Sequence, residues 1–279
     1  MSKILFLLEG ASLEKDIFDS VIPLFLRGSN FDREDGVVCI YGTHIYTLYS
    51  KMRTDDGLDL VGLLLENVEK YPELQKVADE SDGDPTEIFE AIYLLFDYDG
   101  HVNMPRTGDG SHIDGDAALA EMLDFFDDAV GNGKLLVSYP MGDAIKYLSD
   151  PPSSKEEIEL SKCKGPHCPN LSCEYRRNRM MCPPLRVFKG DANNRHPEWV
   201  DIKEISPSDW TRIFSSHLKV GELLCGDTGN INSQIDIFRI QQRDYISQDC
   251  PKVAILSGFP FLFVDFIGID KLRERLSGM

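Results

Sequence analysis

Four short runs of apolar residues limit the folds open to this chain more than any other feature of its sequence. They lie within residues 4–8, 37–41, 91–96 and 134–139, and each contains consecutive apolar side chains without regular polar alternation. A strand with one face in water alternates polar and apolar residues, whereas a strand that is covered on both faces does not. The runs therefore predict buried strands, as in a parallel sheet packed between helices.

Stretches with the apolar spacing of helices separate these runs. Residues 12–27, residues 58–69 and a segment beginning at Asp116 have apolar side chains three or four positions apart, and a further short helix is expected over 142–148. Alternating strands and helices predict an α/β fold with a mostly parallel central sheet and helices on both of its faces. Ligands of such sheets gather beyond the carboxyl ends of the strands. Functional residues are therefore expected there.

The regular alternation is interrupted once, which suggests three parts. Residues 1–150 form the predicted catalytic domain, and residues 151–200, rich in proline and cysteine, are interpreted as an insertion or small module. In residues 201–279 we expect helices over 207–225 and 227–247, followed by a final strand over 252–256 that completes the core.

Charge and hydropathy restrict the classes of function. Lys and Arg number 29 against 47 Asp and Glu, which gives a formal net charge of −18. This balance opposes simple electrostatic binding of nucleic acid, although a site that holds divalent cations is locally positive. No apolar run reaches the roughly 18 residues of a membrane span, and the N-terminus lacks the basic region of a signal peptide. We therefore expect a cytoplasmic protein without a membrane partner.

Three carboxylates stand at predicted strand ends. Glu9 follows the first apolar run, and Asp97 and Asp99 follow the run over 91–96. Mg²⁺ prefers hard oxygen ligands and needs only one or two carboxylates when phosphate supplies further oxygens. Two such ions about 4 Å apart can activate water and stabilise the leaving oxygen of a phosphodiester. Taken singly, Glu9 is also explained as an acid at a helix N-terminus and the Asp-x-Asp pair as a turn.

The segments Leu8-Glu9-Gly10 and Phe96-Asp97-Tyr98-Asp99 resemble the glutamate–glycine turn and the Asp-x-Asp motif of the topoisomerase–primase (TOPRIM) family. Within it, the sequence is most similar to the nuclease branch, as in the overcoming-lysogenization-defect nucleases and the small TOPRIM effectors of bacterial anti-phage defence. The resemblance covers roughly residues 3–148. It implies that Glu9 is a metal ligand or general base, and that Asp97 and Asp99 bind Mg²⁺ or Mn²⁺.

Four further residues are candidates around this motif. Many nuclease members of the family have a second acid four residues after the glutamate, but here Glu14 is five residues after Glu9. One residue turns a side chain about 100° around a helix, so a metal-binding role for Glu14 stays open. Asp143 is the alternative acid, while Lys15 and Lys146 could offset phosphate or transition-state charge. A solvated helix face is the favoured interpretation of all four. His101, close behind the Asp-x-Asp pair, is either a metal or phosphate contact or a bystander in a loop.

A cysteine cluster offers a second metal hypothesis. Cys163, Cys168, Cys173 and Cys182, with His167 beside them, supply enough ligands for a tetrahedral structural zinc. Paired C-x2-C knuckles are missing, so a loop of reduced thiols is the competing interpretation. The basic run over 176–179 lies in the same segment and could follow a phosphate backbone or contact the protein's own acids.

The leading hypothesis is a metal-dependent nuclease that cleaves DNA, RNA or tRNA. The resemblance implies a regulated effector in anti-phage defence that acts with a separate ATPase chain, and this sequence has no G-x-x-x-x-G-K-[ST] motif of its own. The alternative is a non-catalytic binding or assembly protein that keeps the fold and uses its acidic surface for a partner. A phosphotransfer enzyme with Asp97 as nucleophile is a third possibility, but Tyr139-Pro140-Met141-Gly142 does not supply the phosphate loop it would need.

Overall fold

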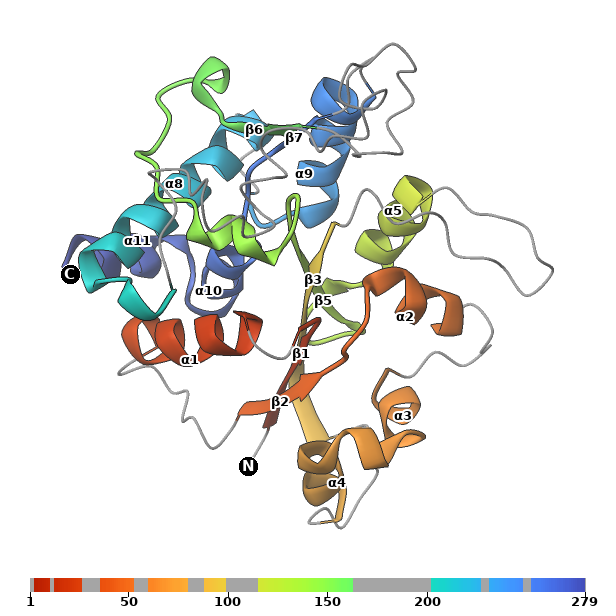
Figure 1. Ribbon diagram of the computed structural model, residues 1–279. Coiled ribbons are helices and arrows are strands. Elements are labelled where there is room, and N and C mark those ends of the chain that lie inside the picture. Colours follow the sequence, from red (N-terminus) through yellow and green to blue (C-terminus); the bar gives the residue numbers. More distant parts are fainter. Residues whose placement is uncertain are drawn as a thin grey trace, which may run out of the picture. The chain divides into compact units, whose positions relative to one another are not determined.

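The computed structural model (Figure 1) describes residues 3–10, 13–26, 36–52, 60–79, 88–98, 115–162, 202–226, 231–247 and 252–278. The chain forms two compact units that do not follow the predicted boundary at residue 150. The first consists of residues 1–96 and 103–136, and the second of residues 97–102 and 137–279. The two are described separately below.

A five-stranded sheet, largely in the first unit, has the order β2-β1-β3-β5-β4. Its strands are β1 (Lys3–Leu8), β2 (Gly36–Ile40), β3 (Phe89–Asp97), β4 (Asp127–Asp128) and β5 (Gly133–Ser138). β1 is parallel to both β2 and β3, and only the short β4 is recorded as antiparallel, to β5. The predicted α/β class and mostly parallel sheet are confirmed. The last residue of β3 and the last two of β5 are assigned to the second unit.

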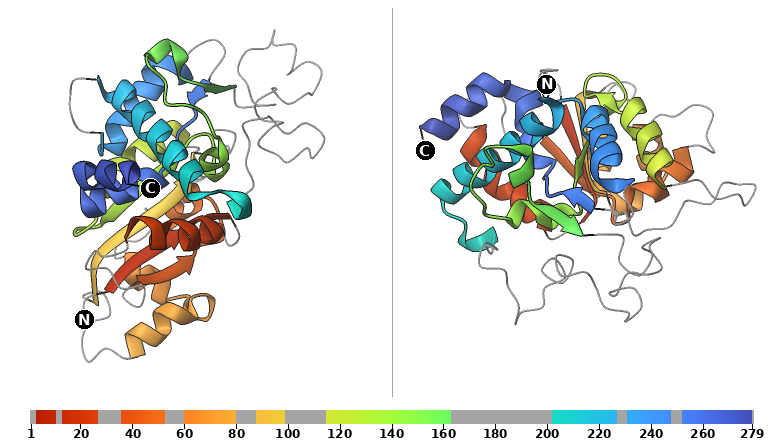
Figure 2. Two further views of the ribbon diagram at one scale, coloured as in Figure 1. Left: turned by 90° about the vertical axis from the view of Figure 1, so that its left-hand side faces the viewer. Right: turned by 90° about the horizontal axis from the view of Figure 1, so that it is seen from above.

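Helices lie on both sides of this sheet within the first unit (Figures 1 and 2). α1 (Leu13–Phe25) is on one side, and α2 (Ile45–Met52) and α5 (Gly115–Phe125) are on the other. Phe18 of α1 packs edge-on against Phe6 of β1, with 4.6 Å between the ring centroids. The predicted helix over 58–69 is divided into α3 (Leu60–Leu65) and the 3-10 turn η2 (Val68–Lys70), and α4 (Pro72–Asp79) follows.

The β4–β5 hairpin depends on a glycine. Gly133 has φ of +113°, which is unfavourable for residues with a side chain, and a Cβ there would lie 2.9 Å from Leu94 Cδ1. This close approach lets β5 begin directly beside β3. Lys134, Leu135 and Leu136 then continue buried in the sheet.

The second unit is mainly helical. It contains α8 (Pro207–Cys225), α9 (Gln234–Gln241), α10 (Phe259–Ile267) and α11 (Ile269–Ser277), and a π-helical turn η9 (Gln242–Ile246) continues α9. The 3-10 turns η4 (Gly142–Lys146), η5 (Lys155–Glu157) and η7 (Ile202–Glu204) complete its helical segments. Ser206 and Asp209 begin α8 with a capping box, which satisfies two backbone N–H groups at the helix start.

The predicted final strand is present, but it does not join the five-stranded sheet. β7 (Lys252–Ala254) is antiparallel to β6 (Leu160–Lys162) in a separate two-stranded sheet. The residues after β7 contact the end of β5 through an isolated antiparallel bridge between Tyr139 and Leu256. Residues 151–162 belong to the second unit, whereas the remainder of the expected small module, with all four clustered cysteines, lies outside the described residues.

None of the described helices combines the length and the apolar character that crossing a membrane requires.

Candidate functional site

Glu9 lies at the carboxyl edge of the sheet in the first unit. Its N–H donates to the carbonyl of Leu95 at 3.1 Å, and its carbonyl accepts from the N–H of Gly42 at 2.9 Å. These two bonds connect the residue after β1 to β3 and to the turn after β2. Because the backbone is held from both sides, the position of the half-buried Glu9 is determined by the sheet itself.

Two lysines gather around the aromatic residue that follows β2. The Nζ of Lys70 donates to the carbonyl of Tyr41 at 2.5 Å and lies 5.3 Å from the centroid of the Tyr41 ring and 5.6 Å from that of Tyr71. The Nζ of Lys51 is 5.9 Å from the Tyr41 centroid. Such cation–π contacts hold positive charge near an aromatic face. The chain is strongly acidic as a whole, yet this edge of the first unit carries cations.

The chemistry of the surrounding buried groups fits a structural role. Burial raises the pKa of Tyr41 well above its ordinary value, with a smaller contribution from Tyr71. Burial likewise raises the pKa of the Cys39 thiol to about 12, with Glu73 adding to the shift. A thiol with so high a pKa stays protonated at neutral pH and is a poor nucleophile. Cys39 and Tyr41 therefore support the edge by packing.

Asp97 is the last residue of β3 and belongs to the second unit. The next residue, Tyr98, is anchored there, because its N–H donates to the carbonyl of Ser138 at 3.0 Å and its ring lies 5.4 Å from that of Tyr139. Glu9 belongs to the first unit, so the convergence of Glu9 and Asp97 stays a prediction. Asp99 and His101 lie outside the described residues.

The other predicted site residues have local partners. Lys15 is exposed on α1 and its Nζ lies 2.8 Å from Asp19 Oδ2, one helical turn away. In the second unit, Asp143 and Lys146 form an ion pair at 2.8 Å within η4. Glu14 is part of α1, but its side chain is not among those described. Catalytic roles for Lys15 and Asp143 stay predictions.

The described residues contain no group of three or more His, Cys, Asp or Glu side chains arranged to hold a metal ion. Other predicted ligands lie outside the described residues: Asp99 and the cysteines at 163, 168, 173 and 182. The magnesium and zinc sites therefore stay predictions.

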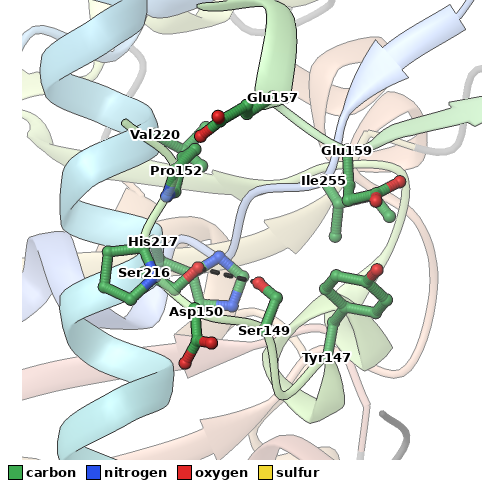
Figure 3. Close-up of a pocket in the computed structure, with 11 residues that line it drawn as sticks. Tyr147, Ser149, Asp150, Pro152, Glu157, Glu159, Ser216, His217, Val220 and Ile255 are labelled. Atoms are coloured by element: carbon green, nitrogen blue, oxygen red, sulfur yellow. Dashed lines mark hydrogen bonds between the residues drawn. The ribbon is translucent and has the colours of Figure 1, made fainter. Parts of the chain in front are cut away.

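A cavity of about 180 Å³ lies within the second unit and was not predicted from the sequence. Figure 3 shows its lining, which comes from the segment after η4, from α8 and from the residue after β7. Apolar side chains share this lining with hydroxyls, carboxylates and a histidine; the residues are Tyr147, Ser149, Asp150, Pro151, Pro152, Glu157, Glu159, Ser216, His217, Val220 and Ile255.

His217 is the most unusual group in this lining. It lies in α8 with 2% of its surface exposed, and its Nδ1 accepts from the N–H of Ser257 at 3.3 Å. Its Nε2 is buried as well. Burial lowers the pKa of this imidazole to about 4, while a backbone hydrogen bond with Ala144 opposes the shift in part. The ring is therefore neutral at pH 7, and because Nδ1 is an acceptor, the proton is on Nε2.

Two hydroxyls belong to the same cavity lining (Figure 3). Ser149 Oγ and Ser216 Oγ are 2.9 Å apart and form a hydrogen bond in which either can be the donor. The hydroxyl that accepts keeps its own hydrogen.

No protein-family model, curated protein or solved structure matches this chain.

The signals for the two sites in the sequence are unequal. Glu9 and Asp97 directly follow or end apolar runs, which marks them as candidates, whereas Lys51 and Lys70 lie outside every element predicted from the sequence. The cavity residues Ser149, Ser216 and Ile255 are far apart in the sequence and form no motif. Only the pairing of β6 with β7 and the position of α8 bring them together.

Proposed function

We propose that this protein is a metal-dependent nuclease of the TOPRIM type, which hydrolyses phosphodiester bonds of DNA or RNA. The observation that carries the proposal is the pairing of β1 with β3 as parallel neighbours, in which Leu8 is opposite Leu95. Glu9 follows Leu8 directly, and Asp97 closes β3 after one further residue. Parallel neighbouring strands end at the same edge of a sheet, and ligand sites of α/β proteins form at that edge.

The residues present suit the proposed metal. Glu9, Asp97 and Asp99 would supply hard carboxylate oxygens to Mg²⁺ or Mn²⁺. Bound there, the ions would supply an activated water and charge stabilisation for the leaving oxygen. Lys70 and Lys51 add positive charge beyond β2, where the first unit would meet the phosphates of a substrate.

The proposal extends to regulation and partners. In the TOPRIM branch that the sequence resembles, small effectors act with an ATPase in anti-phage defence, and this chain carries no Walker-type phosphate loop in its sequence. We propose that ATP dependence, where it exists, comes from a second chain.

The test is cleavage of labelled tRNA, single-stranded DNA and plasmid by the full chain in Mg²⁺ or Mn²⁺. Asp97→Asn keeps the size of the side chain and removes its charge, so we expect its cleavage rate to fall to about 1% of the original or less. The matched control is Asp124→Asn, since Asp124 is an exposed acid on α5; it should cleave like the unchanged protein.

A second candidate, a non-catalytic binding or assembly protein, is favoured by the net charge of −18. Equal cleavage by Asp97→Asn and Asp124→Asn would point to a contaminating nuclease. No cleavage of any of the three substrates in either metal, with a purified partner ATPase included, would reject the nuclease and leave the binding protein.

A further inference from the structure

One peptide group links Glu9 to a lysine outside the sheet. The N–H of Gly42 donates to the carbonyl of Glu9 at 2.9 Å, and the Nζ of Lys70 donates to the carbonyl of Tyr41 at 2.5 Å. These two bonds involve opposite ends of the same Tyr41–Gly42 peptide, and a peptide group is planar and rigid. An ammonium that holds the oxygen of this peptide therefore also fixes the direction in which its N–H points.

The charge of Lys70 strengthens both of these bonds. Hydrogen bonds with an ionised donor are about twice as strong as neutral ones. A cation at the carbonyl oxygen also draws electron density from the peptide nitrogen, which makes the N–H on the other side a better donor. Both effects improve the bond that Gly42 makes to Glu9.

The ammonium of Lys70 is itself held in place. Its Nζ lies 5.3 Å from the ring centroid of Tyr41 and 5.6 Å from that of Tyr71, and both rings are buried. A Cβ on Gly42, which has φ of +77°, would lie 3.9 Å from the same Nζ. Cation–π contacts with two rigid rings therefore keep the charge beside the turn that follows β2.

We propose that Lys70 is a positioning residue for Glu9, which it holds in place through the Tyr41–Gly42 peptide. This inference rests on the proposed function, because it requires that Glu9 binds the metal ion. Groups that orient a metal ligand without touching the metal typically change metal affinity by about ten- to a hundredfold when they are removed.

The experiment is a calorimetric titration of the full chain with Mn²⁺ in the absence of nucleic acid. Lys70→Met keeps an unbranched side chain but removes the donor and the charge. Loss of a positive charge alone would strengthen the binding of a divalent cation, since like charges repel. We expect the opposite result, about tenfold weaker binding, because Glu9 is no longer held. The sign of the change therefore separates positioning from simple charge.

Two further variants of the lysines complete this comparison. Lys51 has its Nζ 5.9 Å from the Tyr41 centroid, whereas the bond to the Tyr41 carbonyl comes from Lys70. Lys51→Met thus loses the same charge and keeps that bond, so it should bind Mn²⁺ as tightly as the unchanged chain or more tightly. Lys70→Arg retains a charged donor and should recover most of the affinity that Lys70→Met loses.

A second readout follows the peptide itself and needs no metal. In NMR spectra of the chain with isotope-labelled glycine, the amide proton of Gly42 should shift upfield in Lys70→Met, because the peptide loses its polarising cation. Lys76→Met is the matched control, since Lys76 is exposed on α4; it should change neither the Gly42 signal nor the Mn²⁺ affinity. Lys70 is exposed as well, so Lys70→Met should keep the fold, which urea unfolding checks.

The outcomes distinguish this inference from the proposed function. Mn²⁺ binding that is as tight in Lys70→Met as in the unchanged chain, or a Gly42 signal that does not move, would overturn the role of Lys70 alone. No Mn²⁺ binding by the unchanged chain would reject the proposed metal site, and the role of Lys70 with it.

Discussion

At the scale of single residues, His217 shows how a buried polar group can connect distant segments of the chain. Its Nδ1 accepts a hydrogen bond from the N–H of Ser257 and so fixes the residues before α10. The backbone of Ala144 in η4 forms a hydrogen bond with the same ring. One side chain of α8 therefore contacts both η4 and the segment before α10.

The pKa of His217 leads to a prediction about stability. The folded pKa of about 4 is below the ordinary value of 6.5. Between these two pH values the unfolded chain takes up a proton on the imidazole and the folded protein does not. The contribution of the histidine to stability is therefore fully present above pH 6.5 and is lost as the pH falls toward 4. At pH 5 the loss is about 2 kcal/mol at most. The free energy of unfolding, measured with urea, should fall between pH 7.5 and pH 5 in both proteins. The fall should be smaller in His217→Asn than in the unchanged protein, by up to this amount.

The carboxylates also titrate as the pH falls toward 5, so the loss of unfolding free energy in one protein alone does not isolate the effect of the histidine. They are common to both proteins and cancel in the difference between them. An identical drop in the unchanged protein and in His217→Asn would show that the histidine is protonated in the folded state at pH 5.

At the scale of elements, close contact between helices explains a glycine inside α8. A Cβ on Gly221 would lie 2.7 Å from Cζ and 2.9 Å from Cε1 of Phe261 in α10. At a solvent-exposed position inside a helix, alanine would be more favourable than glycine by about 1 kcal/mol. Here Phe261 is fully buried and has no room to move away. The contact between α8 and α10 therefore requires a residue without a side chain.

We expect Gly221→Ala to lower the free energy of unfolding by about 1–3 kcal/mol, the usual cost of overpacking, which exceeds the gain in helix propensity. Gly278→Ala is the control, because a Cβ there meets only ordinary contacts of 3.6 Å or more. Both are measured by chemical denaturation. A Gly221→Ala protein as stable as the original would mean that α10 shifts to admit the methyl group.

Elements with an unambiguous local pattern could be predicted from the sequence. β1 and β3 could be predicted because their unalternating runs end at Glu9 and at Asp97, and α8 because its apolar spacing extends from Trp210 to Leu224. α10 could not, since Phe259–Ile267 is apolar almost throughout and shows no helical period. The pairing of β7 with β6 depends on contacts between distant segments, which short patterns do not encode.

At the scale of the whole molecule, the two units are formed by interleaved parts of the chain. Residues 97–102 belong with 137–279, and residues 103–136 belong with 1–96. A boundary drawn from composition is always a single point in the sequence, so the predicted boundary at residue 150 could not describe this exchange. The positions of Glu9 after β1 and of Asp97 at the end of β3 could be predicted, because each follows an apolar run directly. The cavity lined by His217 could not, because its lining comes from segments that are distant in the sequence.

The net charge of −18 belongs to the whole chain and leads to a last prediction. Many like charges held in a compact protein repel one another, and salt screens this repulsion over a distance of about 10 Å at 0.1 M. We therefore expect the melting temperature at pH 7.5 to rise by a few degrees between about 0.02 and 0.3 M NaCl. At pH 5 the rise should be smaller, because part of the carboxylates are then protonated and the net charge is lower. A melting temperature that falls with salt at pH 7.5 would show that attractive ion pairs, such as Arg273 with Glu222 and Lys219 with Glu222, outweigh the repulsion.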